Sequence, residues 1–115
     1  MVKKAFGDNI IRFFAMMSVV INIIAWLLAV TTLMRQPSPI VLHYNAYFGV
    51  DIDGDRKWSL LLPGTGLIIL TINYALALYF FKKSKLAARI FVGTAFLFNL
   101  IINLGIVTLI FVNRV

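Results

Sequence analysis

The chain has 115 residues, of which 62% are hydrophobic and 13% charged, and its formal net charge is +7. A soluble domain of this size cannot hide so much apolar surface, because small domains bury only part of what their chains expose. The composition therefore predicts a protein surrounded by lipid. The chain has no cysteine, which excludes disulfides, iron–sulfur clusters and thiol catalysis.

Three apolar runs without a charged side chain predict membrane-spanning helices. They cover 21, 22 and 23 residues, at Phe13–Leu33, Leu60–Phe81 and Ile90–Val112. At about 1.5 Å per residue each run is roughly 31–35 Å long, enough to cross a hydrocarbon core of about 30 Å. A helix satisfies its own backbone hydrogen bonds, as lipid requires.

The first helix is expected at residues 10–34. Lys3 and Lys4 form a basic leader like that of a signal peptide, but the apolar run is longer than the usual signal core of about 7–15 residues. It also ends in Met34-Arg35-Gln36-Pro37 instead of a small-residue cleavage site. We therefore expect this segment to be retained as a helix.

Residues 35–59 form the expected external loop. Pro37 and Pro39 end the first helix, and the near-alternation of apolar and polar residues at Ile40–Asn45 predicts a short strand or extended arm. Aromatic side chains suited to the headgroup level follow along the loop, at Tyr44, Tyr47, Phe48 and Trp58. We expect the loop to fold back on the membrane surface.

Three aspartates in this loop, Asp51, Asp53 and Asp55, resemble the opening of an EF-hand calcium loop. The pattern fails at its sixth position, which is Arg56 instead of Gly, and at its twelfth, which is Leu62 instead of Glu. The remaining interpretations are a solvated turn at Asp53-Gly54, with the acids pairing with Arg56 and Lys57, or a looser metal site with His43. We favour the turn and expect no metal and no cofactor.

The second and third helices are expected at residues 60–81 and 87–113, joined by a tight turn at residues 82–86. A connection this short predicts an antiparallel hairpin. Pro63 is tolerable in a first helical turn, and small residues in both spans allow helices to approach closely, namely Gly64, Gly66, Gly93 and Gly105. The sequence thus predicts an all-α membrane protein, with one integral membrane domain over residues 1–115 and an antiparallel bundle of three transmembrane helices.

The basic residues sit at the ends of the apolar runs, where they orient helices in a membrane, and not in a patch typical of nucleic-acid binding. The amino-terminal tail and the 82–89 connection together hold seven Lys and Arg, whereas the opposite side holds four. The bias predicts a cytoplasmic amino terminus, an external loop and an external carboxyl terminus.

Four asparagines lie inside the predicted spans: Asn22, Asn73, Asn99 and Asn103. Because the second helix runs opposite to the other two, we expect Asn22, Asn73 and Asn99 at similar depth. An unpaired amide is costly in hydrocarbon, so these side chains should point at one another. The favoured interpretation is interhelical hydrogen bonding, and the alternative is a polar site for an ion or ligand.

The loop carries an ordered set of polar residues: Pro39, His43-Tyr44-Asn45, Gly49-x-Asp51, Gly54 and Lys57, followed by a helix with Pro63. This pattern resembles the small membrane domain of unknown function in bacterial proteins related to the sporulation-delaying-protein immunity family. The resemblance covers residues 37–65. It implies a bacterial membrane protein, with candidate binding residues at His43, Tyr44, Asn45, Gly49, Asp51 and Lys57.

With one His, no Cys and no acidic residue inside the spans, the sequence favours a non-enzymatic protein. We expect the external loop to recognise a protein partner, peptide or lipid, as in an accessory, immunity or signalling factor of the bacterial cytoplasmic membrane. Beyond the bilayer, a homo-oligomer or a larger membrane protein is the expected partner. The alternative is an oligomeric channel or transporter whose path is lined by the four asparagines.

Overall fold

The computed structural model describes residue 5 and residues 7–36, 40–45 and 49–114, with the backbone alone for 40–45, 49–54, 56 and 114. It contains three long helices: α2 (Asn9–Thr31), α3 (Leu61–Phe80) and α4 (Lys85–Arg114). Two short 3-10 helices extend them, η1 (Leu33–Arg35) after α2 and η2 (Arg56–Leu60) before α3. The predicted fold of three helices is confirmed.

All three helices are long and apolar enough to cross a membrane. The qualifying segments are Asn9–Arg35, Lys57–Phe80 and Lys85–Asn113. The first two of these segments are longer than α2 and α3 themselves, because they also include residues of η1 and η2.

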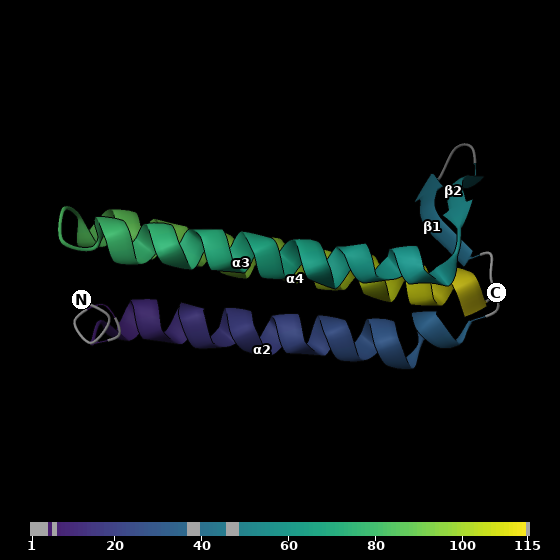
Figure 1. Ribbon diagram of the computed structural model, residues 1–115, viewed down its shortest axis with the longest axis horizontal. Coiled ribbons are helices and arrows are strands. Elements are labelled where there is room, and N and C mark those ends of the chain that lie inside the picture. Colours follow the sequence, from purple (N-terminus) through teal and green to yellow (C-terminus); the bar gives the residue numbers. More distant parts are fainter. Residues whose placement is uncertain (1–4, 6, 37–39, 46–48, 115) are drawn as a thin grey trace.

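The bundle is elongated, with extents of 48 × 28 × 17 Å. Helix α4 packs along both α2 and α3, and these two contact each other less. Figure 1 shows the start of α2 and the α3–α4 connection together at one end, which we call the turn end. The strands and the end of α4 lie at the other end, the hairpin end. The long axis therefore separates two chemically different ends.

The hairpin end carries two antiparallel strands, β1 (Ile40–Asn45) and β2 (Gly49–Gly54). The strand expected at Ile40–Asn45 is β1, and β2 is its unpredicted partner. The register places Val41 opposite Asp53 and Ile40 opposite Gly54, with an irregularity around His43. The interpretation of a turn at Asp53-Gly54 was therefore wrong, because both residues are held in the ladder by β1.

Two clusters of buried apolar side chains lie in the interior of the described part of the bundle. One, near the hairpin end, is centred on Ala25, Leu33, Ile106 and Leu109. The other, near the turn end, is centred on Ile11, Ala77, Ala88 and Val92. The buried face of α2 is made mostly of small side chains at helical spacing, Ile11, Ala15, Ser18, Asn22, Ala25 and Ala29, which lets α4 approach closely.

Candidate functional site

A layer of amide hydrogen bonds lies between the two apolar clusters. Asn22 on α2 donates from Nδ2 to Oδ1 of Asn99 on α4 at 2.9 Å, and to the carbonyl oxygen of Pro63 on α3 at 3.2 Å. Asn99 donates from Nδ2 to the carbonyl oxygen of Gly66 at 3.2 Å and to that of Ala95 at 2.9 Å. These bonds connect all three helices at one level.

Asn103 extends this layer by one turn. Its Nδ2 donates to the carbonyl oxygen of Ile21 at 2.9 Å and to that of Asn99 at 3.1 Å. Asn22 and Asn99 are 4% and 0% exposed, so both are shielded from the bundle surface. In hydrocarbon each such interhelical bond is worth about 0.6–2 kcal/mol, and the layer can therefore fix how the helices align.

Gly66 makes this layer possible. A Cβ atom at this position would lie 2.5 Å from Oδ1 of Asn99 and 3.0 Å from Nδ2 of Asn22. The other described span glycines, Gly64, Gly93 and Gly105, would place a Cβ in open space within this chain. We expected all four glycines to allow neighbouring helices to approach closely. Within this chain, only Gly66 of these four has side chains of other helices so close that a Cβ atom would not fit.

Asn73 lies outside the layer, contrary to the expectation of similar depth. Its Nδ2 donates to the carbonyl oxygen of Ile69 in its own helix at 2.8 Å. Its neighbour Tyr74 donates its hydroxyl to the carbonyl oxygen of Ala15, which is seven residues, or about 10 Å along the helix, from Asn22.

The α3–α4 connection explains this offset. Gly66 precedes the end of α3 by the same 14 residues by which Asn99 follows the start of α4. A short connection makes residues equally distant from it face each other, so Gly66 and not Asn73 meets Asn99.

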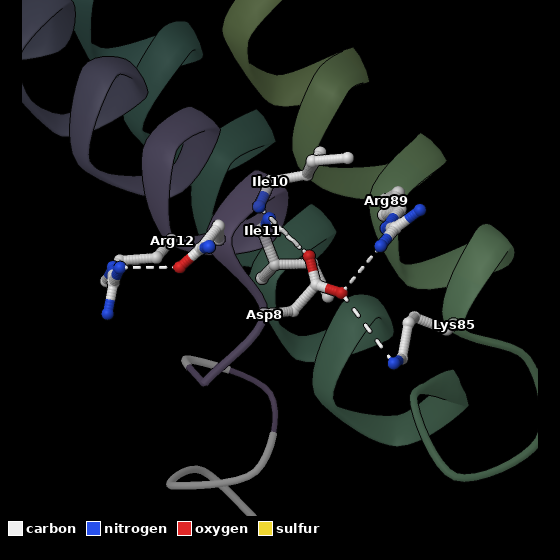
Figure 2. A network of polar contacts seen from close by, with 7 residues as sticks. Asp8, Ile10, Ile11, Arg12, Lys85 and Arg89 are labelled. Carbon is white, nitrogen blue, oxygen red and sulfur yellow. Dashed lines mark hydrogen bonds and ion pairs between the residues drawn. The ribbon is translucent and has the colours of Figure 1, made fainter.

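A second polar contact joins α2 and α4 at the turn end. Figure 2 shows the Asp8 carboxylate between the start of α2 and two basic side chains of α4. Oδ1 of Asp8 accepts from the backbone N–H groups of Ile10 and Ile11 at 3.0 and 3.1 Å, which makes Asp8 the N-cap of α2. Oδ2 accepts from Nη2 of Arg89 at 2.8 Å, with Nζ of Lys85 at 3.9 Å.

The hydrogen bond from Arg89 lowers the pKa of Asp8. The hydrogen bonds from the N–H groups of Ile11 and Ile10 lower this pKa further, whereas partial burial of the carboxylate raises it. The Asp8 side chain is 5% exposed. The Nε of Arg89 is buried without a partner among the described residues. Asp8 thus gives one oxygen to the helix and one to the guanidinium, and it remains ionised at neutral pH.

Five of the six candidate binding residues of the loop lie in the hairpin. His43, Tyr44 and Asn45 belong to β1, while Gly49 and Asp51 belong to β2. Backbone pairing sets Asn45 opposite Gly49 and Tyr44 opposite Val50. A metal site at His43 with the aspartates falls outside the described side chains.

Lys57 stands apart from the hairpin, in η2. Its backbone N–H donates to Oδ1 of Asp55, the N-cap of η2, at 2.9 Å. The sequence led us to expect that the loop acids pair with the side chains of Arg56 and Lys57. At Asp55 the observed partner is instead the backbone N–H of Lys57.

Reasoning from the sequence missed Asp8 and its pairing with Arg89. The signal was present, because Asp is a typical N-cap residue and Asp8 is the single acidic residue ahead of the first apolar run. Nothing in the sequence distinguished Gly66 from the other glycines, because its role depends on the side chains of Asn22 and Asn99 from other helices.

Comparisons of the chain with protein-family models, with curated proteins and with solved structures gave no match.

Proposed function

We propose that this chain is a non-enzymatic membrane protein whose three-helix bundle anchors the hairpin end as a recognition surface outside the bilayer. The observation that carries this proposal is the attachment of the hairpin to the bundle. β1 pairs with β2 along its length and also packs against α4 and η2. The hairpin is thus held in place by the helices and not only tethered between them.

The kind of partner follows from the exposed edge of this small sheet. Among the described elements the sheet has two strands, so β2 has one edge that faces no other described strand. An extended peptide segment of a partner protein can add to such an edge by main-chain hydrogen bonds. In this proposal His43, Tyr44, Asn45 and Asp51 supply specificity.

The proposed orientation follows the distribution of charge. The turn end carries Lys82, Lys83 and Lys85, and by the positive-inside tendency it faces the cytoplasm. In this proposal the hairpin end then lies on the external face of the membrane. The family resemblance implies that this membrane is the cytoplasmic membrane of a bacterium.

The alternative of an oligomeric channel has less support from the amides. Asn22, Asn99 and Asn103 donate to groups of the same chain and hold its helices together. Lining a path would require these bonds to break. Liposomes containing the purified chain should therefore leak K⁺ and protons no faster than empty liposomes, and a leak that disappears in an Asn99→Leu variant would favour the channel.

A photo-crosslinking experiment tests the recognition proposal. A photoreactive amino acid is placed at His43 or Asp51 in the full-length chain, and the control position is Lys82 at the turn end. Irradiation of native membranes should give a protein adduct of one defined mass from the hairpin positions and not from Lys82. Adducts with lipid alone from both hairpin positions would contradict the proposal.

A hairpin replacement provides the second arm of this test. Residues 40–54 are exchanged for a Gly/Ser linker of equal length, which leaves the amide layer untouched. The variant should keep its helical content in detergent and lose co-purification of the crosslinked partner. Retained co-purification would place recognition elsewhere.

A further inference from the structure

The turn end carries a concentration of basic side chains that neither the amide layer nor the hairpin uses. Exposed basic residues come from α2, the α3–α4 connection and the start of α4, at Arg12, Lys82, Lys83 and Lys85, and the partly exposed Arg89 lies beside them. Figure 1 places the start of α2 and the connection at the same end. One end of the bundle thus presents a strongly positive surface.

The acid at this end is already engaged. Asp8 shares its carboxylate between the N–H groups of α2 and the side chains of Arg89 and Lys85, as Figure 2 shows. The other three acidic residues of the chain are Asp51, Asp53 and Asp55, which belong to the hairpin end. No carboxylate of the described residues is paired with Lys82 or Lys83, so their charges are available to an external anion.

The depth of these lysines matches the headgroup region of a bilayer. The second span ends at Phe80, and Lys82 and Lys83 follow after one more apolar residue, Phe81. Nζ of Lys83 lies 5.0 Å from the ring centroid of Tyr79 and 5.7 Å from that of Phe80. A lysine held over interfacial aromatic rings keeps its ammonium at the boundary between hydrocarbon and water.

Exposed apolar side chains adjoin the basic residues: the ring of Tyr79 lies below the ammonium of Lys83, and Leu86 and Ile90 directly follow Lys85 and Arg89 in the sequence. Tyr79 is 59% exposed on α3, and Leu86 and Ile90 are 66% and 59% exposed on α4. A ligand for this surface must therefore offer an anionic group at one depth and hydrocarbon next to it. An acidic soluble peptide matches the charges and not the apolar flank.

We propose that the turn end binds anionic phospholipids, with the phosphate of the headgroup at Lys82 and Lys83 and the acyl chains along Tyr79, Leu86 and Ile90. Clusters of Lys and Arg next to a membrane span attract anionic lipid, and the contribution of each charge corresponds to about a fivefold change in affinity. The attraction between exposed charges is screened by salt. The surface thus favours anionic over zwitterionic lipid in the leaflet at the turn end.

Lipid titration of the full-length chain tests this proposal. The chain in a non-ionic detergent is titrated with dioctanoyl phosphatidylglycerol or dioctanoyl phosphatidylcholine, and native mass spectrometry measures the bound fraction. The test variant is Lys82→Gln with Lys83→Gln. The matched control is Arg35→Gln with Lys57→Gln, which removes two exposed charges at the hairpin end.

The wild-type chain and the control should bind phosphatidylglycerol more tightly than phosphatidylcholine, and the test variant should lose about 25-fold in affinity for phosphatidylglycerol. Soluble glycerol phosphate should not compete, because it lacks acyl chains. Equal affinity for the two lipids, equal weakening in both double variants, or competition by glycerol phosphate or by an acidic peptide would each overturn the proposal.

Discussion

Gly66 shows how a single backbone position decides which polar groups meet inside this bundle. The absence of a Cβ leaves room for the hydrogen bond between Asn22 and Asn99, whose atoms a larger residue would contact at 2.5–3.0 Å. Gly64, two residues earlier on the same helix, meets nothing within 4 Å. The two positions therefore form a natural pair for measurement.

We expect Gly66→Ala to destabilise the bundle by about 1–3 kcal/mol, because the added methyl group overpacks the amide layer and displaces Asn99. Gly64→Ala should be neutral or stabilising by up to about 1 kcal/mol, since alanine is the better helix former. Unfolding of both variants by sodium dodecyl sulfate in mixed micelles, followed by circular dichroism, checks this. Equal effects of the two substitutions would contradict the role given to Gly66.

The asparagine side chains differ in whether they bond to another helix or within their own. Asn99→Leu removes bonds to α2 and α3 and should cost about 0.6–2 kcal/mol per interhelical bond. Asn73→Leu removes a bond within α3 and should change stability by much less. The same micelle titration measures the free energy of unfolding of the two variants. A larger decrease for Asn73→Leu than for Asn99→Leu would contradict the assignment of Asn99, and not Asn73, to the amide layer.

Among the elements, the start of α2 depends most on one side chain. Asp8 caps α2 and at the same time ties it to α4 through Arg89, 81 residues later in the chain. Capping and ion pairing can be separated, because an Asn at this position can still accept from the helix N–H groups but carries no charge. Asp8→Asn therefore isolates the contribution of the charge.

Because the folded state lowers the pKa of Asp8, its carboxylate stabilises the fold at pH values above the usual pKa of an aspartate, about 3.9. This stability is lost as the pH falls through the lowered pKa. The thermal midpoint of the wild-type chain in detergent should thus fall more steeply than that of Asp8→Asn between pH 6 and pH 2. Parallel curves for the two proteins would show that the pairing with Arg89 contributes nothing.

At the scale of the whole molecule, the two ends of the bundle differ in charge and in structure. The turn end is basic and contains the short α3–α4 connection, whereas the hairpin end carries the two strands and the end of α4 (Figure 1). Both ends project beyond the apolar spans, so their sides of the membrane can be measured independently.

The absence of native cysteine makes this measurement direct. In intact cells a membrane-impermeant maleimide should label Lys57→Cys at the hairpin end, and it should label Lys82→Cys only after permeabilisation. The physical reason is the larger number of basic residues at the turn end, which favours the cytoplasm. Labelling of both variants in intact cells would contradict the proposed anchoring.

The sequence by itself determined the number, length and order of the helices. An uninterrupted apolar run of more than about 20 residues forms a helix in lipid, because only a helix satisfies all backbone hydrogen bonds within one segment. It also located the first strand at Ile40–Asn45, where apolar and polar residues nearly alternate. The second strand and the end of the loop depended on pairing with β1, which local pattern does not encode.

Only the tertiary structure decided which polar residues meet. Asn73 and Asn99 are equally plausible in sequence, yet the short α3–α4 connection brings Gly66 to Asn99 and leaves Asn73 about two turns away. Asp8 and Arg89 meet because α2 and α4 pack side by side. Alignment between helices is set by the connection and by side-chain volume at their contacts, and these are properties of the assembled bundle.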